Sequence, residues 1–193
     1  MLKNPVKIVR INLTTASIQV EELDSDFYRL YPGGKALAGY YLLRELPPHI
    51  DAFDPQNLLV IANGLVTGSP LSTATRYIVS ARSPLTHAYG ESEAAGFWGP
   101  ELKMAGFEAL LITGKAAKPV YILIEDDRVQ LKDAGALWGK KNGYGTGEYM
   151  VNTHGDKTCW IAIGAAGENL VRTALALATH DCTVSAGFGA VMG

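Results

Sequence analysis

The sequence reads Leu58-Leu59-Val60-Ile61-Ala62, an uninterrupted apolar run that is typical of a β-strand buried on both faces. Turn-forming residues follow at Asn63-Gly64 and at 67–70, and another strand pattern begins at Arg76. We therefore expect residues 58–62 to form a strand buried on both faces.

Working outward from this strand, the patterns change between strand and helix. Alternation over 6–13 and 17–23 predicts a hairpin, and apolar residues at helical spacing predict a helix over 35–46 that ends before Pro47-Pro48. Further strands are predicted at 76–81, 109–113, 120–125, 128–132 and 158–163, and a short helix at 100–105. Residues 89–96 form a polar and small segment, and 142–147 form a glycine-rich loop. Because strands and helices do not alternate regularly, the pattern predicts an α+β fold.

Composition limits the functional classes. A chain of 193 residues fits one domain, and its net charge of −2 gives no electrostatic case for nucleic acid or an anionic membrane. The two cysteines, Cys159 and Cys182, lack metal-ligand spacing and fit a reducing, cytoplasmic location. No apolar run approaches the ~20 residues of a membrane span, and residues 1–5 do not resemble a signal peptide.

The chain ends on residues that are all glycine or apolar, 187–193. Domains usually end in exposed polar residues, because a free carboxylate is costly to bury. We therefore expect the protein to continue beyond Gly193. The 21 glycines fit either a strand-rich fold with many tight turns or a binding surface built from backbone.

Common catalytic motifs are missing from the sequence. No GxxxxGK(S/T), HExxH or GxSxG occurs, and neither 143–147 nor 187–192 completes GxGxxG. The histidines are scattered, and each is expected on the surface or in a turn: His49, His87, His154 and His180. No residue is therefore assigned a catalytic role.

Two features could still bind ligands. Glu91 and Glu93 share one face if they lie on a strand, and they are either an acid/base or metal site or part of a solvated loop. Arg76 follows a loop of small polar residues, and its planar fork of donors suits an anion, although a surface salt bridge is an equal alternative.

An ordered series of segments adds a family resemblance. The segments include Gly33-Gly34-Lys35-Ala36-Leu37-Ala38, Gly64-Leu65-Val66-Thr67-Gly68-Ser69-Pro70, Arg76-Tyr77-Ile78-Val79, Ser83-Pro84-Leu85-Thr86, Gly99-Pro100-Glu101-Leu102-Lys103-Met104-Ala105-Gly106-Phe107, Leu137-Trp138-Gly139-Lys140 and Ile163-Gly164-Ala165-Ala166-Gly167-Glu168. In this order they resemble the N-terminal domain of the aldehyde:ferredoxin oxidoreductase family, over essentially all of residues 1–193.

The resemblance implies a fold and a function. Family members carry tungsten, or molybdenum, on two pterins, and a 4Fe–4S cluster passes electrons from an aldehyde or oxo substrate to ferredoxin. Their N-terminal domain has two packed β-sheets with a few helices, and it forms a base for the bis-pterin. The cluster ligands belong to later domains, so residues 1–193 alone are expected to be inactive. A homodimer is also compatible with the family.

The resemblance also implies roles for single residues. Arg76 matches an arginine that contacts the pterin phosphates. Glu93 stands where the family has an asparagine whose backbone carbonyl helps hold a magnesium ion between the phosphates, and Ala95 matches a glycine of the same loop. A third stretch falls where the family has an arginine- and glycine-rich run, and it contributes Cys182, Thr183 and Ser185.

This chain departs from the family at Glu93 and around Cys182, where the arginines are missing. A carboxylate at position 93 repels phosphates unless it faces a cation. A second hypothesis is therefore a stand-alone binding or scaffold module that kept the fold without redox activity.

Overall fold

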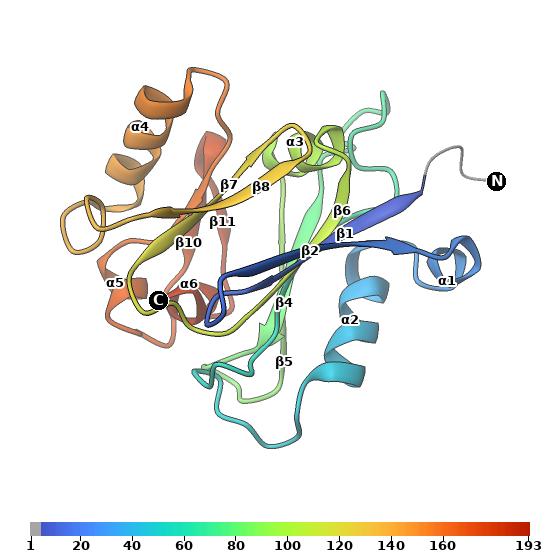
Figure 1. Cartoon of the computed structure of the whole chain (residues 1–193), viewed down its shortest axis with the longest axis horizontal. Helices are drawn as coiled ribbons and strands as arrows, with labels where there is room; N and C mark the ends of the chain where they lie inside the picture. The colour runs from blue at the N-terminus through green and yellow to red at the C-terminus, as the bar shows by residue number, and fades with distance from the viewer. Residues whose placement is uncertain (1–4) are drawn as a thin grey trace.

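The largest sheet has six strands in the order β2-β1-β6-β3-β4-β5 in the computed structural model, which describes residues 5–193 (Figure 1). The strands are β1 (Val6–Asn12), β2 (Ser17–Leu23), β3 (Leu59–Asn63), β4 (Tyr77–Arg82), β5 (Tyr89–Ala94) and β6 (Phe107–Thr113). β1 and β6 are parallel, and the other neighbours are antiparallel. The predicted strand buried on both faces is confirmed, because all residues of β3 are buried and β3 lies between β6 and β4. The signal-peptide prediction falls mostly on residues 1–4, outside the described range.

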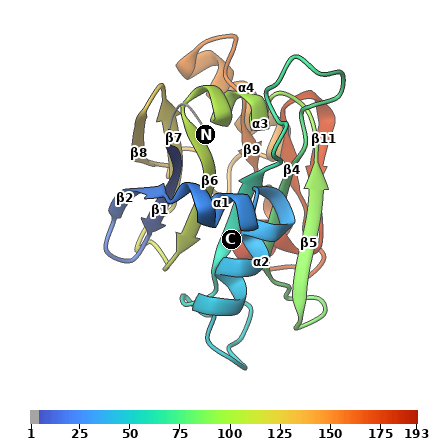
Figure 2. The ribbon, with the colours of Figure 1, turned by 90° about the vertical axis from the view of Figure 1, so that its right-hand side faces the viewer.

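Two smaller sheets contain the remaining strands. They are formed by β7 (Val120–Glu125) with β8 (Arg128–Asp133), and by β9 (Ile161–Ala162), β10 (Ala176–Ala178) and β11 (Cys182–Val184) in the order β11-β10-β9. β11 lies beside β5, the edge strand of the large sheet (Figure 2). The α+β prediction is confirmed.

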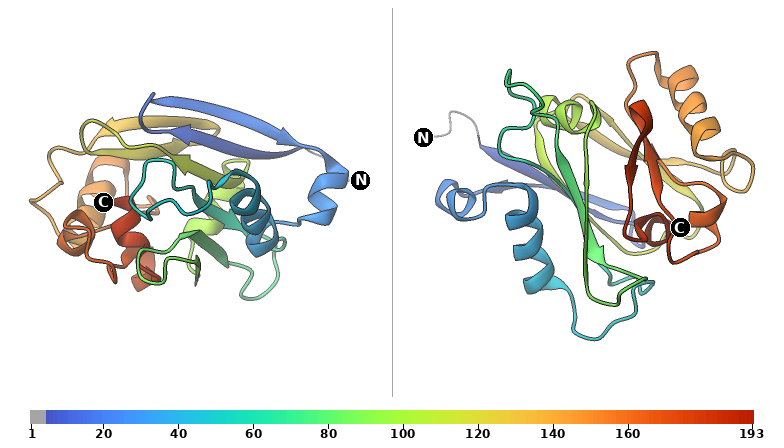
Figure 3. Two further views of the ribbon diagram at one scale, coloured as in Figure 1. Left: turned by 90° about the horizontal axis from the view of Figure 1, so that it is seen from below. Right: turned by 180° about the vertical axis from the view of Figure 1, so that it is seen from behind.

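Helices cover both sides of the large sheet. They are α1 (Ser25–Leu30), α2 (Gly34–Glu45), α3 (Trp98–Met104), α4 (Gly143–His154), α5 (Ala165–Glu168) and α6 (Phe188–Met192), with a 3-10 turn at Thr179–Asp181. α2 lies on one side of β4 and β5, and the C-terminal segments lie on the other (Figure 3). The large sheet is therefore the middle layer of the molecule.

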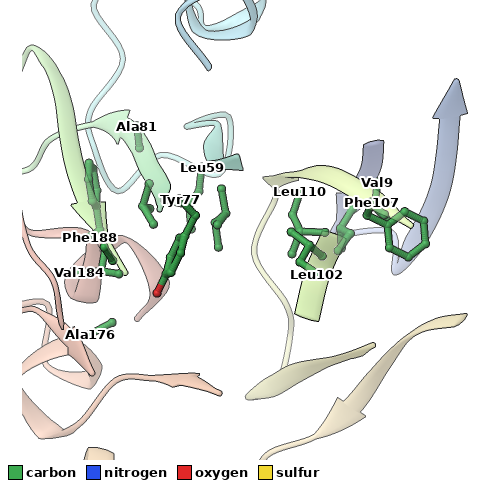
Figure 4. Close-up of a cluster of buried hydrophobic side chains, with 14 residues drawn as sticks. Val9, Leu59, Tyr77, Ala81, Leu102, Phe107, Leu110, Ala176, Val184 and Phe188 are labelled. Atoms are coloured by element: carbon green, nitrogen blue, oxygen red, sulfur yellow. The ribbon is translucent and has the colours of Figure 1, made fainter. Parts of the chain in front are cut away.

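The central strand β3 divides its side chains between two hydrophobic clusters. Leu59 and Ile61 belong to the cluster that contains Phe188 (Figure 4). Val60 and Ala62 belong to the cluster beneath α1 and α2. Fully burying a large apolar side chain contributes about 1.5–3 kcal/mol, so β3 stabilises both layers at once.

The polar segment at 89–96 contains a strand that the sequence did not reveal. Residues 89–94 form β5, whose alternate residues Gly90, Ser92 and Ala94 are buried. A Cβ atom on Gly90 would lie 3.1 Å from Phe188 Cζ, so the inward positions have little room. Small inward residues and charged outward residues hide the apolar alternation that normally identifies a strand.

The glycine-rich loop predicted at 142–147 is wrong, because α4 begins at Gly143. A Cβ atom on Gly147 would lie 2.1 Å from Trp160 Cζ2, and one on Gly143 would lie 2.7 Å from Leu177 Cδ1. These glycines therefore allow close packing of the helix rather than a turn. The strand expected at 158–163 is also shorter than predicted, since β9 contains only residues 161 and 162.

We expect Asn142→Ala to lower the free energy of unfolding by about 1 kcal/mol. Asn142 is the N-cap of α4, and its side-chain oxygen accepts a 2.8 Å hydrogen bond from the Gly145 N–H. Urea denaturation followed by tryptophan fluorescence measures the change. Asn142→Asp keeps the acceptor and is the matched control; equal stability of the alanine and aspartate variants would contradict the capping role.

Candidate functional site

The backbone of Arg76 is fixed although its side chain is exposed. The Arg76 carbonyl accepts hydrogen bonds from the Gly64 N–H, at 3.1 Å, and from the Thr67 hydroxyl. The Arg76 side chain, directly before β4, is 61% exposed. A guanidinium on a fixed backbone beside solvent is well arranged to meet an anion.

The start of α2 is bridged to Gly64, the residue whose N–H binds the Arg76 carbonyl. Gly33 and Gly64 form an antiparallel bridge where β3 ends, and α2 begins at Gly34. This arrangement directs Lys35, in the first turn, toward β5, where its Nζ lies 2.6 Å from Glu91 Oε1. The hydrogen bond to Glu91 raises the pKa of Lys35.

Four charged residues form one cluster here, Lys35, Arg76, Glu91 and Glu93, which we call the four-charge cluster. Glu91 and Glu93 are two residues apart on β5 and therefore share a face. Arg76 Nη1 lies 3.3 Å from Glu93 Oε1. Each cation thus has a carboxylate partner, and the cluster has no net formal charge.

A buried acidic residue lies beneath the glycine bridge. Glu108 on β6 is 3% exposed, and one of its oxygens is paired with Lys103 Nζ. Its other oxygen, Oε1, has no hydrogen-bond partner and lies 2.7 Å from the point where a Cβ atom on Gly33 would sit. Burial raises the pKa of Glu108, and Lys103 opposes that rise.

The other sequence-derived candidates lie around the same strand but on its opposite side. Ser185, directly after β11, donates its N–H to Ser92 Oγ at 2.9 Å. Cys182 Sγ lies 3.2 Å from the position that a Cβ atom on Gly96 would occupy, next to Ala95. Cys182 is half-buried.

Exposure and side-chain direction separate the candidates into two groups. Thr183 and Ser185 are exposed, and Ala95 is half-buried. Since neighbouring residues of a strand point to opposite faces, Glu93 turns toward Arg76 while Ser92 turns toward Ser185. The structure therefore brings all six candidates to β5 but divides them between its two faces.

The sequence analysis did not predict that Lys35 and Tyr89 contact Glu91 in the candidate site. Lys35 contacts Glu91, and the Tyr89 hydroxyl donates a 3.1 Å hydrogen bond to Glu91 Oε2. The Gly33-Gly34-Lys35 sequence at a helix start was an available signal for the lysine. Tyr89 carried no such signal, because its role depends on β5 being a strand.

Two surface hollows lie near the cluster, and neither is lined by Arg76 or Glu93. The larger one, about 550 Å³, is lined by Lys35 and by residues of α1 and α2, and a second of about 240 Å³ lies near Pro47 and Tyr89. Within residues 5–193, no three His, Cys, Asp or Glu side chains converge to hold a metal ion. In the same range, no helix has the length and apolar character needed to cross a bilayer.

Nearly the whole chain matches a known family. The family model described as the N-terminal domain of aldehyde ferredoxin oxidoreductase matches residues 8–193. This chain belongs to the aldehyde ferredoxin oxidoreductase family. Over 194 residues, this oxidoreductase-family domain is 40% identical to the tungsten-containing aldehyde ferredoxin oxidoreductase of Pyrococcus furiosus, covering 100% of this chain and 32% of that protein. The chain thus spans about a third of the length of the curated relatives it matches.

Other relatives of this aldehyde ferredoxin oxidoreductase domain carry different names. The WOR-like subunit of an aliphatic sulfonate oxidoreductase from Pyrococcus furiosus is 30% identical over 203 residues, covering 97% of this chain and 32% of that one. Among solved structures, the active site complex BamBC of benzoyl coenzyme A reductase superposes with a TM-score of 0.92 at 36% identity, covering 97% of this chain and 29% of the other. The fold expected from the family is confirmed.

Proposed function

We propose that this domain carries the phosphate end of a tungsten or molybdenum bis-pterin cofactor in an oxidoreductase that acts on an aldehyde or oxo group. The observation that carries the proposal is the Arg76 side chain, exposed beside β5 on a backbone held by two hydrogen bonds. The names of the relatives refer to aldehyde, sulfonate and benzoyl coenzyme A chemistry. A domain common to them suits a part of the enzyme that does not select the substrate.

The residues fit a phosphate-bearing cofactor. Arg76 and Lys35 offer two cationic side chains on one face, and exposed Thr183 and Ser185 offer hydroxyl groups on the other side of β5. When bound, the metal–pterin group supplies the two-electron chemistry of the substrate. This domain binds and orients that group, and no residue of it needs to move a proton.

Several finer roles belong to the same proposal. The Glu93 backbone carbonyl would help hold a magnesium ion at the phosphates, and Ala95, Cys182, Thr183 and Ser185 would contact the cofactor. The 4Fe–4S cluster and the substrate pocket come from later domains of the same polypeptide. Ferredoxin or a similar carrier accepts the electrons in the cytoplasm, and the enzyme can form a homodimer.

We expect Arg76→Ala in the full-length protein to lower the retention of pterin and of tungsten or molybdenum. A guanidinium–phosphate hydrogen bond is charge-assisted and about twice as strong as a neutral one, so its loss speeds cofactor dissociation. Metal analysis and pterin fluorescence after gel filtration measure the retention. Arg128→Ala, on the exposed end of the β7–β8 hairpin, is the matched control. Unchanged pterin and metal content would exclude Arg76 as a phosphate clamp.

One observation favours the alternative, a binding or scaffold module without redox activity. Both cations of the four-charge cluster already have carboxylate partners in the protein. The gene sequence distinguishes the two functions. A reading frame that continues into helical sequence with a CxxCxxxC motif supports the enzyme, whereas a stop codon directly after Gly193 supports the scaffold.

A further inference from the structure

The two carboxylates of the four-charge cluster are held very differently. Both oxygens of Glu91 are engaged, Oε1 with Lys35 Nζ at 2.6 Å and Oε2 with the Tyr89 hydroxyl at 3.1 Å. The Tyr89 hydroxyl is itself within 3.2 Å of Ser80 Oγ on the neighbouring strand. Glu91 is therefore tied to both α2 and the sheet, and its side chain is only 24% exposed.

Glu93 has a much weaker attachment. Its Oε1 is 3.3 Å from Arg76 Nη1, and its side chain is 44% exposed. The Arg76 side chain is 61% exposed, while the Arg76 carbonyl is fixed by Gly64 and Thr67. This contact can therefore open by rotation of two exposed side chains, with the backbone unchanged.

We infer that the Glu93 carboxylate is the resident counterion of Arg76 and is displaced when a phosphate group binds there, whereas Glu91 stays on Lys35. The inference rests on the proposed function, because it assigns the phosphate to Arg76. It explains how a carboxylate can occupy a phosphate-binding surface: it neutralises the arginine in the free protein and turns into solvent in the complex. The phosphate competes with Glu93, so Glu93 sets the affinity of the site.

The exposure of the Arg76–Glu93 ion pair determines how strongly Glu93 lowers the affinity for phosphate. Exposed ion pairs are weak because water and salt screen them, so removing the Glu93 charge is expected to tighten phosphate binding by about two- to fivefold. Removing the Glu91 charge has a different consequence. It frees Lys35 and loosens the contacts to Tyr89, without changing the partner of Arg76.

Calorimetric titration with inorganic pyrophosphate tests whether a phosphate group displaces Glu93 from Arg76. The protein is the full-length chain from a host that cannot make pterin, in buffer with EDTA at fixed ionic strength. We expect Glu93→Gln, and Glu93→Asn as a second neutral variant, to bind pyrophosphate about two- to fivefold more tightly than the unsubstituted protein. We expect a smaller gain from Glu91→Gln, the matched control on the same strand face, because it frees Lys35 but leaves Glu93 on Arg76. The gain should also vanish when Arg76→Ala is combined with Glu93→Gln.

Each outcome decides a separate point. Equal or weaker binding by both Glu93 variants overturns the inference. A gain that persists without Arg76, or an equal gain from Glu91→Gln, also overturns it, because general charge repulsion would then be the cause. If Arg76→Ala alone leaves pyrophosphate binding unchanged, the proposed phosphate clamp fails first, which is a distinguishable result.

Discussion

Gly33→Ala is expected to lower the free energy of unfolding by about 3–5 kcal/mol, because two separate costs add at this residue. Gly33 has φ 71° and ψ −171°, a backbone conformation that is essentially reserved for glycine. A Cβ atom would also lie 2.5 Å from the Asn63 carbonyl oxygen and 2.7 Å from Glu108 Oε1. The carbonyl belongs to β3 and cannot move away without disturbing the central strand.

Gly39→Ala is the matched control for this prediction. Gly39 lies inside α2, the helix that begins directly after Gly33, and a Cβ atom there would meet nothing within 4 Å. We expect this variant to be as stable as the unsubstituted protein or more stable by about 0.5–1 kcal/mol, since alanine favours a helix over glycine. Urea denaturation of both variants measures the difference. Similar stabilities for the two alanine variants would mean that the junction of α2 and β3 is not as tight as described.

Lys103→Met is expected to destabilise the protein by about 2–4 kcal/mol at pH 8. Methionine keeps an aliphatic side chain of similar length at position 103 but removes the cation that faces Glu108. A fully buried pair that loses one partner costs about 3–5 kcal/mol, and the estimate is lower here because the Lys103 side chain is 30% exposed. Glu108 itself is 3% exposed, so its buried charge would lose the cation that offsets burial.

The loss should depend on pH in a defined direction. Burial raises the folded-state pKa of Glu108 above its ordinary value of 4.5, and removing Lys103 raises it further. Above the folded-state pKa, the free energy of unfolding is reduced, because the ionised carboxylate is better solvated in the unfolded chain. As the pH falls from there toward 4.5, the folded protein takes up the proton first, and stability is recovered.

Unfolding curves of Lys103→Met between pH 8 and pH 5 measure this dependence. Glu108→Gln added to Lys103→Met supplies a neutral side chain of similar shape, so it should restore much of the stability at pH 8. A loss that is equal at every pH would show that the lysine acts by packing rather than through its charge.

The elements that could be predicted from the sequence are those whose signal is local. Three strands were predicted correctly: β3 from the apolar run at 58–62, and β1 and β2 from the alternation at 6–13 and 17–23. Burial on one or both faces of a strand gives a pattern in neighbouring residues that the sequence shows directly. The residues of β5 gave no such signal, since Gly90 and Ser92 are small enough to face Phe188 and Ser185. Whether residues 89–94 form a strand therefore depends on contacts with residues almost a hundred positions away in the sequence.

The glycines of α4 show the same limitation. A local interpretation of residues 142–147 favours a turn, because glycine weakens helices. The helix forms because Gly147 lies against Trp160, a contact that exists only in the folded chain. Asn142 is the N-cap of this helix, and no cap was predicted there because the segment was expected to be a loop.

The candidate site was only partly predictable. Arg76 and Glu93 were candidates from their sequence setting, and the family resemblance gave them roles. Their 3.3 Å contact joins them in the structure. Lys35 and Tyr89 depend on the start of α2 reaching β5, which is a tertiary arrangement. The division of the candidates between the two faces of β5 also required the strand itself, because alternation determines which side chain points where.

The central claim is that this domain carries a metal–pterin cofactor within a larger enzyme. The most direct measurement is elemental and pterin analysis of the full-length protein, purified without oxygen from cells supplied with tungsten and molybdenum. We expect tungsten or molybdenum bound together with pterin, at two pterins for each metal atom. A folded full-length protein that contains neither metal and no pterin would contradict the account.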